Sequence, residues 1–200
     1  MSGKLARSIS GNEIFLLRHG ETEWNAEGRF QGILDSPLTE WGKEQARACG
    51  RKLASVVTGA DAMLASPLGR VRETCSILRS FAEYPDVTWD DALKEVTLGK
   101  WDGLTHVDID AMWPSALAGS SQFDWYFRSP DGEGFETALA RVSDWLGRIE
   151  GVVVAVSHGL LGRIIRGAYL GLSRAEMLAL PVPQDTIWHL CDRRIAGIQT

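Results

Sequence analysis

Two short apolar runs, far apart in the chain, end in nearly the same way. The run Ile14–Leu17 leads into an Arg-His-Gly sequence (Arg18–Gly20), and Val152–Val156 leads into Ser-His-Gly (Ser157–Gly159). Continuous apolar runs of this length are typical of strands buried on both faces of a parallel sheet. If the two strands are neighbours, both imidazoles emerge at the same sheet edge, where functional side chains of α/β folds tend to lie.

Strands and helices alternate along the rest of the chain. The pattern predicts further strands at 62–65, 87–89, 187–190 and 195–200, with helices over 135–149 and 160–170 and after the capping residues Thr39, Ser66, Thr105 and Ser173. Such alternation favours an α/β fold, namely a three-layer α/β/α sandwich with a mostly parallel central sheet.

Three local expectations follow from the same reading. Residues 21–37 are predicted to be a long polar loop, and loops of this length are often functional. The helix after Thr39 is predicted to bury one face, formed by Trp41, Cys49, Leu53 and Val56. Ser66 and Pro67 are expected as the N-cap and first residue of the next helix, which places Arg70 in its first turn.

Composition limits the classes of protein to consider. Two hundred residues suit a single domain, residues 1–200, with 1–12 as a loose leader. A net charge of −5 with interspersed signs gives no nucleic-acid-binding surface, and no apolar run reaches the length of a membrane span. Cys49, Cys75 and Cys191 show neither CxxC spacing nor a disulfide framework. We therefore expect a cytoplasmic protein that binds neither nucleic acid nor membrane.

The residues around the two His-Gly sequences can bind an anion. Arg18 can hold a phosphate or carboxylate with its planar guanidinium, and His19 beside it can act as a base or a nucleophile. Arg70 would add its charge at a helix N-terminus, where free N–H groups already favour an anion. An isolated Arg-His-Gly is equally compatible with a polar strand end. The second His-Gly sequence favours an oxyanion pocket of phosphate size.

The ordered set of motifs resembles the histidine phosphatase superfamily, in its phosphoglycerate-mutase-like branch. The resemblance spans most of the chain and is carried by Arg18–Thr22, Asn25, Gln31–Gly32, Pro37–Thr39, Ser66–Arg70, Glu95, Gly99–Gly103 and Ser157–Gly159. It implies a phosphatase that hydrolyses small phosphomonoesters without a metal or another cofactor.

The resemblance also implies a role for each matching residue. His19 would be the nucleophile that becomes phosphohistidine, and Glu95 the acid that protonates the leaving oxygen and then activates water. Arg18, Arg70 and a protonated His158 would hold the phosphate oxygens. The implied substrate-binding set also contains Asn25, Gln31 and Gly159. Gly159 stands where a phytase-like member carries an Asp, which leaves Glu95 as the better candidate for the acid.

Other functions remain compatible with parts of the pattern. Ala155–Gly159 is also a degenerate nucleophile elbow, in which Ser157 would need His189 with Asp185 or Asp192. A non-catalytic phospholigand-binding module would be expected to lose the nucleophile or the acid. Resembling mutases carry extra sequence after the Trp-x-Gly motif and a tail beyond the final strand, so a phosphatase is favoured.

The remaining expectations concern the segments outside these motifs. Residues 104–130 are expected to form a substrate-side insertion, and Trp101, Trp113 and Trp125 to form one wall of the substrate pocket. His106 and His189 are expected to be surface or structural residues. The spacing of His, Cys and Asp along the chain suggests no metal centre.

Overall fold

A six-stranded sheet forms the centre of the protein. The computed structural model describes residues 11–120 and 124–200. The strand order is β3-β2-β4-β1-β5-β6, and the four strands from β3 to β1 are parallel while β5 and β6 are antiparallel to their neighbours. The strands are β1 (Glu13–Arg18), β2 (Ala62–Ala65), β3 (Val87–Trp89), β4 (Val152–Ser157), β5 (Thr186–Cys191) and β6 (Arg194–Gln199). The predicted mostly parallel sheet is confirmed.

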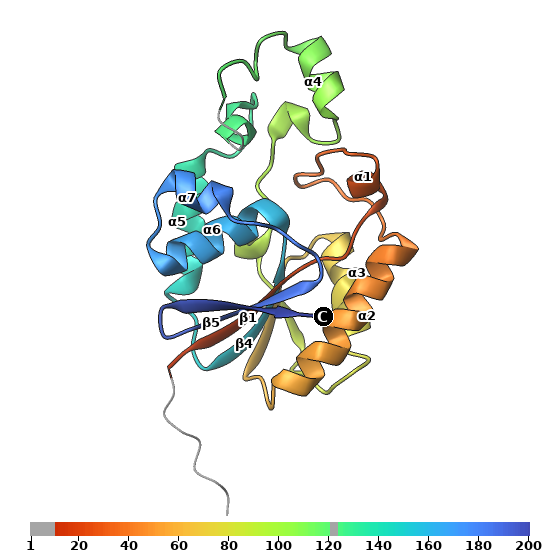
Figure 1. Ribbon diagram of the computed structural model, residues 1–200, viewed down its shortest axis with the longest axis vertical. Coiled ribbons are helices and arrows are strands. Elements are labelled where there is room, and N and C mark those ends of the chain that lie inside the picture. Colours follow the sequence, from red (N-terminus) through yellow and green to blue (C-terminus); the bar gives the residue numbers. More distant parts are fainter. Residues whose placement is uncertain (1–10, 121–123) are drawn as a thin grey trace, which may run out of the picture.

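Helices cover both faces of this sheet and complete the predicted three layers (Figure 1). One face carries α2 (Glu40–Val56) and α3 (Gly69–Leu78), and the other carries α5 (Phe135–Leu146) and α6 (Gly159–Leu170), with α7 (Arg174–Ala179) packed on α6. The shorter elements are α1 (Glu23–Ala26), α4 (His106–Met112) and the 3-10 helices η1 (Asp91–Leu93), η2 (Gly99–Trp101) and η3 (Asp124–Arg128).

The two helical layers explain why the strand sequences are apolar without alternation. In β1, Ile14 and Leu16 join the core beneath α5 and α6, whereas Phe15 and Leu17 join the core beneath α2 and α3. Successive side chains of a strand point to opposite faces, so a strand covered on both sides needs an apolar residue at every position.

The structure corrects the expected buried face of α2. Cys49 and Leu53 are buried, but Trp41 is 63% exposed and Val56 36% exposed. The helix instead turns Gly42, Ala46 and Gly50 inward. A Cβ atom on Gly42 would lie 2.0 Å from the Glu21 carbonyl oxygen, so glycine permits a close helix approach that a search for large apolar residues overlooks.

The predicted start of α3 is also wrong. Its N-cap is Leu68, which has no capping side chain, and the helix begins at Gly69 rather than Pro67. The cap comes from another segment, because the Asp35 carboxylate accepts hydrogen bonds from the N–H groups of Gly69 (2.5 Å) and Arg70 (3.2 Å). The long loop predicted over 21–37 also contains a helix, α1, whose N-terminus is capped by a capping box of Thr22 and Asn25.

The structure describes the two outlying segments of the predicted domain, residues 1–12 and 104–130, to different extents. Most of the expected loose leader, residues 1–12, lies outside the described residues, although Asn12 bonds to Ile149 and Gly151. Of residues 104–130, the described parts 104–120 and 124–130 carry α4 and η3 and lie at one end of the molecule (Figure 1). Among the described residues, no helix is both long enough and apolar enough to cross a membrane.

Candidate active site

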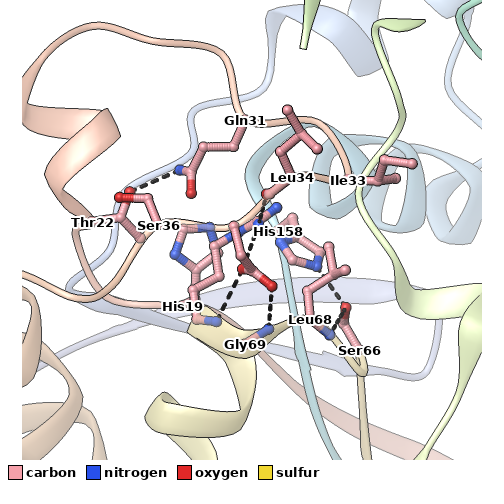
Figure 2. A network of polar contacts seen from close by, with 12 residues as sticks. His19, Thr22, Gln31, Ile33, Leu34, Ser36, Ser66, Leu68, Gly69 and His158 are labelled. Carbon is pink, nitrogen blue, oxygen red and sulfur yellow. Dashed lines mark hydrogen bonds and ion pairs between the residues drawn. The ribbon is translucent and has the colours of Figure 1, made fainter. Parts of the chain in front are cut away.

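The pairing of β1 with β4 brings the two His-Gly sequences together, as the sequence predicted for neighbouring strands. Arg18 and Ser157 are register partners, and the His19 amide donates to the Ser157 carbonyl at 3.1 Å. The rings of His19 and His158 lie side by side with centroids 5.3 Å apart (Figure 2). Both imidazoles are therefore fixed by the strongest part of the fold, the central parallel strand pair.

His19 is held in the form that a nucleophile needs. Its Nδ1 lies 2.7 Å from the Gly20 carbonyl oxygen, an acceptor, so Nδ1 carries the proton and the lone pair remains on Nε2. Burial lowers the pKa of His19 well below its usual value, and the positive charges of Arg70 and Arg18 lower it further. The imidazole is thus neutral at physiological pH, with its Nε2 able to attack an electrophile.

Arg70 is buried and fixed by the loop before α2. Its two terminal nitrogens donate to the carbonyls of Gly32 (2.7 Å) and Leu34 (2.6 Å), and one of them also pairs with Asp35 at 2.9 Å. Asp35 thus caps α3 and orients the Arg70 side chain at the same time. This double contact preorganises the guanidinium at the cavity wall before any ligand arrives.

Three buried side-chain nitrogen atoms at the site have no hydrogen-bond partner among the described residues. They are Nε of Arg18, Nε of Arg70 and Nδ1 of His158. Buried polar groups in proteins are nearly always hydrogen-bonded, so a cluster of unpaired ones needs an explanation. An anion with several oxygen acceptors, such as a phosphate group, would satisfy all three.

The ring of His158 is held by a hydrogen bond to Ser66. Its Nε2 lies 2.7 Å from the Ser66 hydroxyl, and that hydroxyl also accepts from the Leu68 amide at 3.4 Å (Figure 2). Ser66, expected to cap α3, therefore orients His158 instead. If the Ser66 hydroxyl donates to Nε2, the proton resides on Nδ1, the ring atom that has no partner among the described residues.

The protonated His158 expected in phosphoryl transfer stays a prediction, because it concerns the complex with phosphate and not the protein without a ligand. Burial lowers the pKa of His158 well below its usual value, followed by the charges of Arg70, His19 and Arg18. Neutral His158 still donates one hydrogen bond. A bound phosphate dianion would raise its pKa again, because an opposite charge nearby favours the cation.

Glu95 lies against the N-terminus of α6. One carboxylate oxygen accepts from the amides of Val96 (3.0 Å) and Leu161 (2.9 Å), and the other accepts from Leu160 at 3.1 Å. The segment before it is held by Arg141, which donates to the carbonyls of Ala92 and Lys94. The carboxylate that the resemblance singled out is therefore positioned by backbone groups at the rim of the same cavity.

The candidate residues surround one cavity of about 240 Å³. It is lined by Arg18, His19, Asn25, Gln31, Arg70, Glu95 and Gly159, whereas His158, beside His19, is not among the lining residues. Gln31 donates to the Thr22 hydroxyl at 2.8 Å (Figure 2), and its other side-chain atom, Oε1, is buried without a partner among the described residues. Gly159 leaves room for the Arg18 guanidinium, which lies 3.4 Å from where a Cβ atom would be.

Sequence reasoning missed part of the cavity wall. Additional lining residues are Gly28, Arg29, Phe30, Gly32, Val96, Leu98, Tyr126, Leu160, Arg163 and Val182. The expected tryptophan wall is not there. Trp101 and Trp125 pack in a separate apolar cluster with Trp113 against it, and aromatic side chains reach the cavity at Phe30 and Tyr126 instead. Arg163 follows Gly159 by four residues, about one turn of α6, a spacing that could have indicated it.

The structure argues against the nucleophile elbow. The Ser157 hydroxyl is fully buried and donates to the Leu93 carbonyl at 2.9 Å, and Ser157 is not among the residues that line the cavity. His189 pairs with Glu13 at the opposite end of β1 and does not approach Ser157. A serine nucleophile would need a base within hydrogen-bond distance.

The two buried neutral histidines should make the stability of the fold depend on pH. In the unfolded chain both titrate near about 6.5, whereas in the folded protein their pKa values are lower, so the unfolded state binds more protons in mild acid. We expect the free energy of unfolding to fall as pH drops below about 6.5, by up to about 1.4 kcal/mol per pH unit for each histidine. Urea unfolding at pH 7.5, 6.5 and 5.5 measures this slope. A slope in His19→Asn equal to that of wild type would contradict the assignment.

A mostly parallel sheet that brings the buried imidazoles of His19 and His158 together with the buried Arg70 and the half-buried Arg18 is an arrangement suited to a phosphate-like anion beside a nucleophile. The chain belongs to the histidine phosphatase superfamily (branch 1), whose model matches residues 14–193.

Relatives within this family carry both phosphatase and mutase names. The probable phosphoglycerate mutase GpmB of Salmonella arizonae is 34% identical over 170 residues, which are 80% of this chain and 75% of that protein. The α-ribazole phosphatase of Shigella flexneri has a TM-score of 0.79 at 27% identity, covering 94% of this chain and 95% of that one. A mycobacterial glucosyl-3-phosphoglycerate phosphatase has a TM-score of 0.75 at 31% identity, covering 90% and 89%.

Proposed function

We propose that this protein is a metal-independent phosphatase that hydrolyses small phosphomonoesters through a phosphohistidine on His19. The observation that carries the proposal is the state of His19, neutral and with Nε2 unprotonated, beside three unpaired hydrogen-bonding atoms on Arg18, Arg70 and His158. Phosphoryl transfer depends mainly on positioning and on neutralising charge, and these groups offer both without a metal.

In the first step, Nε2 of His19 attacks phosphorus and the bond to the leaving oxygen breaks. Arg18, Arg70 and His158 hold the remaining oxygens as negative charge spreads over them. Glu95 passes a proton to the leaving oxygen, and the alcohol departs. A phosphohistidine and a Glu95 carboxylate remain.

In the second step, water replaces the alcohol. The Glu95 carboxylate takes a proton from the water as its oxygen attacks phosphorus, and the bond to Nε2 breaks. Inorganic phosphate leaves, His19 returns to the neutral form and Glu95 is protonated again. One carboxyl group on the cavity wall serves both steps in opposite directions.

The cavity indicates a small substrate. A volume of about 240 Å³ is below the usual range for ligand sites of about 300–1,000 Å³. Its outer wall combines apolar side chains at Phe30, Leu98 and Val182 with Arg163 and the Tyr126 hydroxyl. Because Tyr126 belongs to residues 104–130, we infer that this substrate-side segment determines specificity. The free thiols of Cys49, Cys75 and Cys191 favour a reducing compartment, the cytoplasm.

A phosphoglycerate-type mutase is the second candidate, because curated relatives carry that name. It would share the first step and then return the phosphoryl group to a second hydroxyl instead of water. Incubation with 3-phosphoglycerate and 2,3-bisphosphoglycerate separates the two activities. Inorganic phosphate is the product expected of the phosphatase, and 2-phosphoglycerate formed faster than phosphate would establish the mutase.

The proposed chemistry predicts activity without metal. We expect p-nitrophenyl phosphate turnover to be unchanged, within about twofold, after dialysis against EDTA, because two arginines replace the charge that a metal would supply. A screen of phosphorylated metabolites in the same buffer then identifies the substrate. Activity that disappears with chelator and returns with a divalent ion would contradict the mechanism. Absence of any turnover, with phosphate still bound, would favour a non-catalytic phospholigand-binding module.

A further inference from the structure

A second cluster of reactive side chains lies at the other end of the sheet from His19. Glu13, His189 and Cys191 bring a carboxylate oxygen, an imidazole nitrogen and a thiol sulfur to within 4.8 Å of one another. Glu13 begins β1 and His19 follows its end, so about 20 Å of strand separates this cluster from the candidate active site. The proposed phosphatase chemistry uses none of these three residues.

The strand pairing explains how the cluster forms. Residues two apart on a strand share a face, which places His189 and Cys191 together on β5. Phe15 on β1 is the register partner of His189, and the same antiparallel register places Glu13 opposite Cys191. Glu13 and His189 are 176 residues apart in the sequence, which is why spacing along the chain gave no sign of a metal centre.

The imidazole is already oriented toward the carboxylate. The His189 ring stacks on Phe15 with centroids 4.5 Å apart and planes 10° apart, and its Nε2 lies 2.9 Å from a Glu13 oxygen. The side chains of His189 and Glu13 are 29% and 22% exposed, and Cys191 is half-buried. The three groups are therefore partly ordered by their neighbours yet open to an ion from solvent.

We propose that Glu13, His189 and Cys191 form a binding site for a zinc ion. Nitrogen, sulfur and oxygen donors are the ligands zinc takes in proteins, and three of them leave the fourth tetrahedral position to water. Zinc bonds of about 2.0–2.3 Å keep ligand atoms about 3.3–3.8 Å apart, so side-chain adjustments of about 1 Å complete the site.

The charges around the cluster suit a divalent cation. A Cys191 thiolate and a Glu13 carboxylate together neutralise the two charges of zinc, while His189 binds as neutral imidazole. The exposed Arg194, opposite Cys191 on β6, is the nearest positive residue in the strand register. Zinc bound here would join β1 to β5 and stabilise the folded state.

The site is tested by titrating zinc into protein from which a chelator has removed all metal, with binding measured by calorimetry. We expect one zinc ion per wild-type chain and at least tenfold weaker binding in His189→Ala, Cys191→Ser and Glu13→Gln. The melting temperature of wild type should rise with zinc, because a ligand that binds only the folded state stabilises it, whereas that of Cys191→Ser should not. His106→Ala, which removes an exposed histidine of α4, should bind zinc as wild type does.

Cobalt provides a signal that depends on the thiolate. Bound in place of zinc, it should give a thiolate-to-cobalt charge-transfer absorption in wild type and His19→Ala, and none in Cys191→Ser. The other two thiols are buried, and burial raises the pKa of Cys49 to about 11 and of Cys75 to about 12. Zinc binding that survives in His189→Ala but is lost in His19→Ala, with no thiolate band, would place the metal at the active site and overturn the proposal.

Discussion

Replacement of His19 by alanine should reduce phosphatase turnover by at least about 10⁴-fold, because the covalent route disappears with the nucleophile. The remaining arginines should still bind phosphate, so the affinity for vanadate should change far less than kcat. Stopping the wild-type reaction in alkali after incubation with a ³²P-labelled substrate should trap one labelled histidine per chain. The variant should trap none, and acid should release the label from wild type.

Two controls make this result specific to Nε2 of His19. His106→Ala removes a histidine that does not line the cavity and should retain activity within about threefold. Imidazole added to His19→Ala should restore part of the turnover, because the small molecule fits the space left by the side chain and supplies the same nitrogen. A His19→Ala enzyme that keeps a tenth of wild-type kcat would exclude His19 as nucleophile.

Replacement of Glu95 by glutamine should lower kcat by about 10³-fold, within the usual range for general acid–base catalysis. The amide cannot donate an acidic proton to the leaving oxygen, and it cannot accept one from water. With p-nitrophenyl phosphate, whose leaving group needs little help, the first step should persist and the second should stall. Labelled phosphoenzyme should therefore accumulate in Glu95→Gln, whereas an alkyl phosphate should react slowly in both steps.

The backbone contacts of Glu95 define the controls. In Glu95→Gln the amide group would face the Leu160 N–H that now donates to the carboxylate, so some loss of thermal stability is expected. Measuring vanadate affinity separates this effect from catalysis, and the affinity should stay within about threefold of wild type. Asp91→Asn, which changes an exposed residue of the 3-10 helix just before Glu95, should keep full activity. If phosphoenzyme fails to accumulate and kcat is unchanged, another group is the acid.

The sequence predicted those parts of the candidate site that depend on short local segments. The apolar runs before His19 and His158 predicted two buried strands, and the motif resemblance pointed to Arg70, Glu95, Asn25 and Gln31. These side chains line the cavity, except that of His158, which is not among the lining residues. Tyr126 was missed because residues 104–130 have no periodic pattern, and nothing local shows which aromatic residue turns toward the cavity.

The sequence by itself determined the sheet-and-helix order and which residues can carry phosphoryl-transfer chemistry, because hydrophobic period and motif order are properties of short segments. Only the tertiary structure decided their working state. Strand pairing places His19 beside His158. Asp35, rather than the expected Ser66, caps α3, and Ser66 forms a hydrogen bond with His158 instead. Burial among arginines makes both imidazoles neutral, and the pairing of β1 with β5 brings Glu13 to Cys191. Desolvation and contacts between distant segments exist only once the chain has folded.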